Sequence, residues 1–161
     1  MPPPDEDAFR RLRQTATALA CPFERALLSR CAACSLARST LLAERELIGC
    51  GSASASERCC AYRAQLRDKA LFALRVDAAG PWPFGKEIRL QCGGLLGLRR
   101  ALDDDEAETT GAPESAAGVR VDDADTLMRE ALARYGELDA LPYSRIMRSV
   151  VGYQPRPRAR R

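Results

Sequence analysis

The sequence predicts a mainly α-helical fold with a minor strand element, and three observations predict it. Apolar residues recur at spacings of three and four along most of the chain, as they do on the buried face of a helix. Only residues 86–92 alternate polar and apolar side chains as a half-buried strand does. A length of 161 residues is enough for one ordinary domain and too short for two. We therefore expect one small helical domain with tails.

Three helical patterns lie between the N-terminus and Cys50. Asp5 or Asp7 can cap the first helix, whose apolar residues follow at helical spacing. A proline in the first turn suits the second helix, over 23–33. The third pattern covers 36–48 and stops where two glycines allow the backbone to turn around Cys50. We expect all three segments to be helical.

The middle of the chain predicts one long helix and the strand. Ser54 and Glu57 have the spacing of a capping box and open a helix that continues to Leu74. The alternating segment 86–92 follows a loop rich in proline and glycine and is expected to be the strand. A turn and a short helix are expected over 93–102.

Charge and composition divide the chain into four parts. Residues 1–102 form a cysteine-rich helical body, and 103–118 carry six acidic and no basic side chains, as a disordered linker does. Residues 119–153 predict two short helices, the first ended by Gly136, and 154–161 form a basic tail. Two short helices cannot form a core alone. The arm 119–153 must dock on another protein or pack back on the body, and we expect docking.

The sequence lacks the apolar run of a secretory signal and any run approaching the roughly 18 apolar residues of a membrane span. We therefore expect a cytoplasmic protein, whose thiols persist or bind metal in a reducing compartment. The odd count of seven cysteines agrees with that expectation. No nucleic-acid-binding motif accompanies the basic tail, so nucleic acid is not expected as a partner.

Six of the seven cysteines are crowded between residues 21 and 60, and this predicts a metal site. The CAAC segment places Cys31 and Cys34 close enough to bind one metal ion or one cluster. Cys50, between its glycines, and either Cys59 or Cys60 would complete four ligands. Cys60 is preferred because its helix face continues toward the presumed core, and adjacent residues on a helix diverge by about 100°.

The absence of histidine excludes Cys₂His₂ zinc sites, Rieske clusters, most haem ligation and Cys–His catalysis. An iron–sulfur cluster, of the [4Fe–4S] type, is the expected cofactor. Zinc is the alternative, because the spacing C-x₂-C-x₁₅-C fits the first three positions of a four-cysteine zinc pattern, although the second close pair is missing. A thioredoxin-like pair and buried thiols without a cofactor are further alternatives. Cys21 and Cys92 are expected to fill the core.

These features together predict a small cytoplasmic iron–sulfur protein, an electron-transfer or accessory subunit of a larger oxidoreductase. Its partners would be protein subunits of a redox complex, reached through residues 119–153. A structural zinc-binding adaptor or a metalloenzyme assembly factor is the alternative function. The sequence contains no acid–base or nucleophile constellation, so we expect no catalytic activity of its own.

Overall fold

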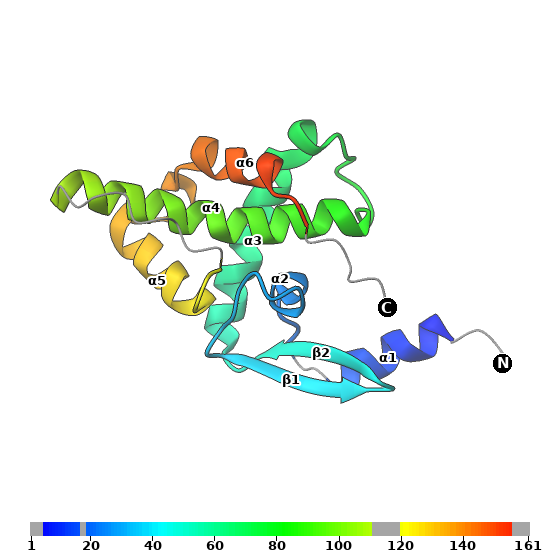
Figure 1. Cartoon of the computed structure of the whole chain (residues 1–161). Coiled ribbons are helices and arrows are strands. Elements are labelled where there is room, and N and C mark those ends of the chain that lie inside the picture. The colour runs from blue at the N-terminus through cyan, green and yellow to red at the C-terminus, as the bar shows by residue number, and fades with distance from the viewer. Residues whose placement is uncertain (1–4, 17–18, 111–119, 156–161) are drawn as a thin grey trace.

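The computed structural model describes residues 5–16, 19–110 and 120–155, and it confirms a mainly helical fold with a minor strand element (Figure 1). The strands form a single antiparallel hairpin within the described residues. In chain order the elements are α1 (Glu6–Ala16), α2 (Glu24–Leu28), β1 (Ala37–Leu42), β2 (Arg45–Cys50), α3 (Ala53–Leu74), α4 (Phe84–Thr110), α5 (Ala124–Tyr135), the 3-10 turn η1 (Leu138–Ala140) and α6 (Tyr143–Gly152).

Helix α4 is the centre of the molecule and contacts α2, α3, α5 and α6 (Figure 1). Residues 90–98 of this helix are buried without interruption, because neighbours cover it on all sides. Two glycines let α6 approach its backbone. A Cβ atom at Gly93 would lie 2.5 Å from the Cα of Val150, and one at Gly97 would lie 2.9 Å from the Cβ of Ser149.

The strand expected over 86–92 was wrong, because this segment is the beginning of α4. Its alternating pattern comes from buried polar residues that have partners within the fold. Glu87 accepts hydrogen bonds from Arg63 and Gln91, and the Gln91 side chain accepts one from the backbone N–H of Ala26. The turn expected within 93–102 is also absent, because α4 runs through this segment.

The expected helix over 36–48 was wrong as well, because this segment forms most of the hairpin β1–β2. Ala43 and Glu44 make the turn, with φ angles of 48° and 65°. Positive φ at both central residues is the mark of the tight turns that join hairpin strands. Cys50 at the end of β2 pairs with Ala37 at the start of β1.

The other helices of the body agree with the sequence in position and differ in their ends. Asp5 caps α1 by accepting hydrogen bonds from two backbone N–H groups at 3.1 Å. Helix α2 ends at Leu28, so the expected helix over 23–33 is shorter and residues 31–34 form a loop. Ser52, not the expected Ser54, caps α3 and accepts from the backbone N–H of Ala55 at 3.3 Å.

The described part of the expected arm packs against the body. Gly136 ends α5, as expected, and Asp123 caps its start. Helix α6 lies along α4 and also contacts α3 (Figure 1). The described part of the arm therefore packs back on the body, which was the alternative to docking. The buried side chains that the arm supplies to the common core are Val121, Leu127, Met128, Ala131, Leu141, Tyr143, Ile146 and Val150.

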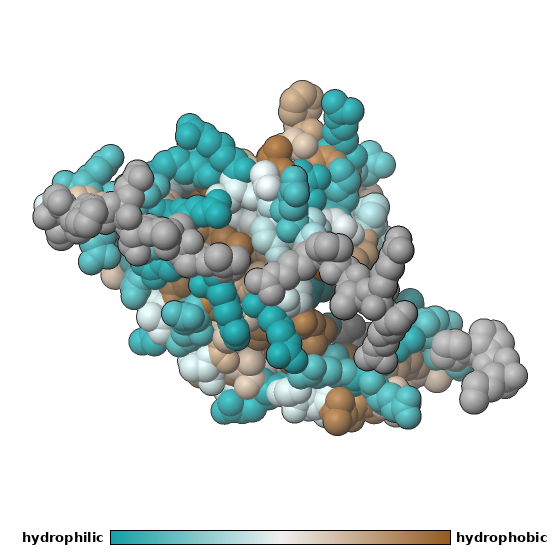
Figure 2. Space-filling view, in the orientation of Figure 1, coloured by the Kyte–Doolittle hydropathy of each residue, from teal (hydrophilic) through white to brown (hydrophobic). Residues whose placement is uncertain are grey.

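Residues 103–110 of the expected acidic linker are helical, because α4 continues through them. The rest of that linker, 111–118, and residues 156–161 of the expected basic tail lie outside the described residues. The face in Figure 2 is mostly hydrophilic, with small separate hydrophobic areas. Among the helices described, none combines the length and the apolar character needed to cross a membrane.

Candidate metal centre

Four cysteine thiols that are distant in the sequence line one small cavity. They belong to Cys21, Cys34, Cys50 and Cys59. The cavity has a volume of about 20 Å³, close to the space that one water molecule needs. The rest of its wall is mainly apolar and is formed by Pro22, Phe23, Leu27, Leu36, Ala55, Ser56, Ala124 and Asp125.

Backbone pairing brings Cys21 and Cys50 to the cavity. The segment before α2 runs beside β2, where the N–H of Cys21 donates to the carbonyl of Ile48 at 3.0 Å. The N–H of Cys50 donates back to the carbonyl of Leu19 at 2.8 Å. The Cys50 thiol also donates to the carbonyl of Ser52 at 3.2 Å, which orients its sulfur at the start of α3.

A second set of backbone contacts positions Cys34. The loop before β1 is held against the segment before α5, where the N–H of Ala33 donates to the carbonyl of Val121 at 2.9 Å. The N–H of Ala124 donates to the carbonyl of Ala33 at 2.8 Å. Cys59 lies in the second turn of α3. The cavity therefore depends on the N-terminal segment, the hairpin, α3 and the segment that leads into α5.

Burial raises the pKa of Cys21 and of Cys59 from 9.0 to about 12. The guanidinium of Arg58 lowers the pKa of Cys59, and the three other thiols of the cavity raise it. Burial is also the largest cause of the raised pKa of Cys34. A rise from 9.0 to about 12 disfavours the thiolate by about 4 kcal/mol. Without a cation these thiols therefore stay protonated at neutral pH.

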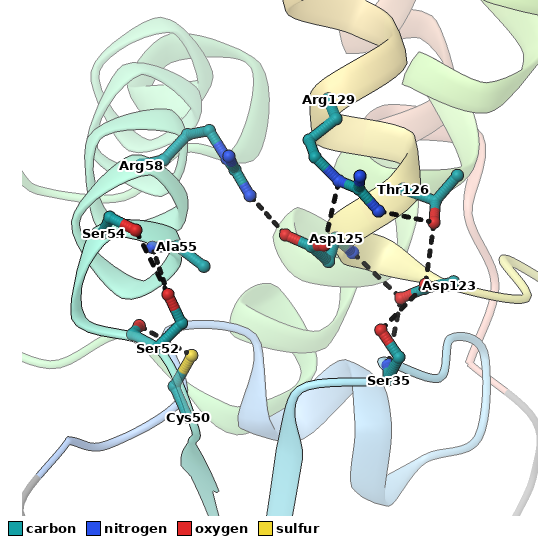
Figure 3. Close-up of polar contacts among 10 residues, drawn as sticks. All are labelled: Ser35, Cys50, Ser52, Ser54, Ala55, Arg58, Asp123, Asp125, Thr126 and Arg129. Carbon is teal, nitrogen blue, oxygen red and sulfur yellow. Dashed lines mark hydrogen bonds and ion pairs between the residues drawn. The ribbon is translucent and has the colours of Figure 1, made fainter.

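Charged residues beside the cavity are paired with one another (Figure 3). The carboxylate of Asp125 forms ion pairs with Arg58 at 2.5 Å and with Arg129 at 3.0 Å. Asp123 accepts hydrogen bonds from the backbone N–H and the hydroxyl of Ser35, both at 3.0 Å. These contacts join α3, α5 and the loop that carries Cys34, so the network holds the wall of the cavity together.

Four cysteine thiols suit a soft metal, but they are not arranged around a single ion. Within the part of the chain that the structure describes, no group of three or more His, Cys, Asp or Glu side chains is arranged to hold a metal ion. A zinc ion about 2.3 Å from each of four sulfurs requires the sulfurs to lie about 3.8 Å apart. The four cysteines therefore line one cavity without the arrangement that a bound zinc ion requires.

The expected pair Cys31 and Cys34 is divided between two places. Cys34 lines the cavity, whereas Cys31 forms a disulfide with Cys92 of α4. The prediction assumed a helical turn or a tight loop, but the segment is extended where Ala32 pairs with Val121 as strand residues do. Residues three apart in an extended segment point to opposite sides. Cys92, which was expected to fill the core, is fully buried but disulfide-bonded.

The adjacent cysteines of α3 also separate, and here Cys59 lines the cavity while Cys60 is exposed. The sequence favoured Cys60 because the helix face toward the core was judged from apolar residues alone. Cys21, expected to fill the core, is the fourth thiol of the cavity. Its pairing with β2 could have been found from the sequence only if 36–48 had been identified as a hairpin.

Comparison of the chain with protein-family models, with curated proteins and with solved structures found no match.

Proposed function

We propose that the chain is a small iron–sulfur protein in which Cys21, Cys34, Cys50 and Cys59 hold the cluster. One observation carries the proposal: these four thiols come from separate segments and line one buried, mainly apolar cavity. Cysteine thiolates are the usual ligands of iron–sulfur clusters, and the chain contains no histidine. A bound cluster would accept and release electrons. The corresponding role is electron transfer, or service as an accessory subunit, in a larger oxidoreductase.

A cluster places a looser demand on the positions of its thiolate ligands than a single ion does. A cluster distributes its four thiolates over several irons, so its ligands stand farther apart than the about 3.8 Å required around zinc. The apolar wall would keep water from the cluster, which is one of the factors that set a reduction potential. A [4Fe–4S] cluster needs more room than about 20 Å³. Loading it would therefore require the cavity to widen.

Metal and sulfide analysis tests the proposal. Protein purified without oxygen should contain iron and acid-labile sulfide in equal amounts, and it should have a broad absorption band at about 400 nm. Serine substitution of any one of the four lining cysteines should remove the colour. Cys60→Ser is the matched control, because Cys60 is the exposed neighbour of Cys59 on α3. Colourless protein with one zinc ion per chain, or full colour in the Cys21→Ser variant, would reject this assignment.

A structural zinc site is the second candidate, and the small cavity favours it. A volume of about 20 Å³ admits one ion without widening, although the sulfurs would have to move inward. The metal would then stabilise the fold, and the chain would act as an adaptor or a metalloenzyme assembly factor. Zinc has no redox chemistry. A redox titration of the metal-loaded protein therefore distinguishes the candidates, since only a cluster shows a reduction potential.

The proposal includes a cytoplasmic location and protein partners from a redox complex. The apolar residues of 120–153 are largely used within the chain's own core, so partner binding would have to use other surfaces. Reversible reduction of the cluster by a co-purified complex would support a role as electron carrier. A cluster that is transferred to an apoprotein instead would indicate an assembly factor.

A further inference from the structure

A second cavity, of about 370 Å³, is lined by Cys31, three residues before Cys34 in the same loop. It is formed by residues at the end of α2, in the middle of α4 and at the end of α6, and α4 contacts both of the other helices (Figure 1). This volume is in the range of pockets that bind small molecules, about 300–1,000 Å³. Its wall consists of Ser29, Arg30, Cys31, Leu96, Arg100, Arg148, Ser149, Gly152, Tyr153 and Gln154, and we call it the arginine pocket.

The arginine pocket is strongly cationic. It contains three guanidinium groups, of Arg30, Arg100 and Arg148, and none of its lining residues is acidic. Over residues 5–16, 19–110 and 120–155, the side chains of Arg30 and Arg148 have no ion-pair partner, and Arg100 donates only to the hydroxyl of Ser149 at 3.3 Å. The three charges come from three separate segments, which are the turn after α2, α4 and α6, so no helix periodicity accounts for their convergence.

Another cavity of the same chain shows what paired arginines look like. Arg63 and Arg67 line it, and both form ion pairs with the buried carboxylate of Glu87, at 2.5 and 3.2 Å. Arg67 also stacks on the ring of Trp82. Those guanidinium groups hold α3 to α4. The arginines of the arginine pocket have no corresponding structural partner, so their charge is available to a ligand.

We propose that the arginine pocket binds a small molecule that carries a phosphate group. Guanidinium groups donate pairs of parallel hydrogen bonds that match phosphate and carboxylate oxygens. Three such groups exceed what one carboxylate can accept, whereas a phosphate or pyrophosphate has the charge and the oxygens to engage all of them. The hydroxyl of Ser149, which accepts from Arg100, adds a neutral donor at the same wall. The concave shape fits a small molecule better than an extended polyanion.

Calorimetric titration of inorganic pyrophosphate into the full-length protein, at constant ionic strength, tests the proposal. We expect saturable binding to one site and at least tenfold weaker binding by the Arg100→Gln and Arg148→Gln variants, because each loses charge-assisted hydrogen bonds. Arg148→Lys should bind between the wild type and Arg148→Gln, since it keeps the charge and loses the fork of donors. Both arginines are exposed, so circular dichroism should show unchanged folding.

Arg10→Gln is the matched control, because it removes one positive charge from an exposed residue of α1, outside the arginine pocket. It should bind pyrophosphate as the wild type does. Equal weakening by Arg10→Gln and Arg148→Gln would overturn the proposal by showing unspecific attraction to net charge, and so would the absence of saturable binding. Iron, sulfide and zinc contents are measured on the same samples. Pyrophosphate binding is independent of their outcome, so this proposal and the metal-centre proposal fail separately.

Discussion

Because the thiols of Cys21 and Cys59 are largely buried, the stability of the protein should depend on pH. Their pKa of about 12 in the folded protein lies above the ordinary 9.0. A group whose pKa is raised on folding contributes its full stability below the unfolded pKa and loses it as the pH rises through the folded pKa. We therefore expect the free energy of unfolding of the metal-free, reduced protein to fall between pH 9 and about 12.

Urea unfolding of the wild type and of a Cys21→Ser/Cys59→Ser variant at several pH values checks this expectation. Tyr135 and Tyr143 also have their pKa raised to about 12, so the wild type alone does not isolate the thiols. The difference between the two proteins does. It should be constant below pH 9 and shrink or change sign above it. A difference that does not vary with pH would contradict the burial of these thiols.

The Cys31–Cys92 disulfide gives a second prediction for single residues. It closes a loop with a sequence separation of 61 residues, for which the chain-entropy model gives a stabilisation of about 4 kcal/mol. Dithiothreitol should lower the unfolding midpoint of the wild type and leave that of Cys92→Ser unchanged. A cytoplasm would reduce an accessible disulfide, but the Cys92 side chain is fully buried.

The same pair of variants separates the two ligand sets. If the ligands are those that line the cavity, Cys31→Ser and Cys92→Ser behave alike, and both keep the metal. Loss of iron or zinc in Cys31→Ser alone would support the ligand Cys31 that the sequence predicted. Cys60→Ser serves as the control in both measurements, because Cys60 is exposed and outside the disulfide.

At the scale of elements, the contact between α4 and α6 depends on glycine. Gly93 has no room for a side chain, since its Cβ would lie 2.5 Å from backbone of α6. Gly93→Ala should therefore destabilise the fold by about 1–3 kcal/mol, as overpacked core substitutions do. Gly85 lies in the first turn of the same helix with nothing within 4 Å of its Cβ. Gly85→Ala should stabilise by up to about 1 kcal/mol through helix propensity.

Denaturant midpoints of these two variants measure the effect. The opposite signs are informative because both substitutions make the same chemical change in one helix. Gly93→Ala at or above wild-type stability would mean that α6 does not approach α4 so closely.

The sequence predicted helices well where local signals were strong. It failed where tertiary contacts determine the secondary structure of a segment. Asp123 and Gly136 bound α5 as caps usually do, and the capped start of α3 was displaced by only two residues. The hairpin was missed because its turn uses Ala43 and Glu44, whereas glycine or asparagine is the usual signal for positive φ. Residues 86–92 have the alternating pattern of a strand although they are helical. The buried residue Glu87 interrupts the apolar face of this helix, and its ion pairs with Arg63 and Arg67 cannot be recognised from the local sequence.

The sequence predicted the type of candidate site, a thiol site, but only some of the cysteines that form it. Cysteine crowding indicated a thiol site, and Cys34, Cys50 and Cys59 were among the candidates. Cys21 could not be recognised, since it reaches the cavity by pairing with a strand that was expected to be a helix. The arginine pocket left no sequence signal at all. Its arginines are spread over more than a hundred positions in an arginine-rich chain and meet only in the folded structure.

At the scale of the whole molecule, residues 120–153 complete the core that the body begins. Ile146 and Val150 of α6 are fully buried against the central helix. A chain whose C-terminal helices share the core should unfold as one cooperative unit. An arm that docks independently would unfold in a separate transition. The thiol cavity also depends on this half, because Ala124 and Asp125 form part of its wall.

Ile146→Ala tests this cooperativity. Truncation of a fully buried isoleucine should cost about 2–5 kcal/mol of unfolding free energy. Trp82 fluorescence reports on the loop before α4, and far-ultraviolet circular dichroism reports on all helices, so the two midpoints should fall together. Val151→Ala on the same helix is the matched control, because Val151 is 46% exposed and its loss should change stability by less than about 0.5 kcal/mol. If Ile146→Ala lowered the dichroism midpoint while Trp82 kept its wild-type transition, α6 would be an independent arm, and the single-core description would be wrong.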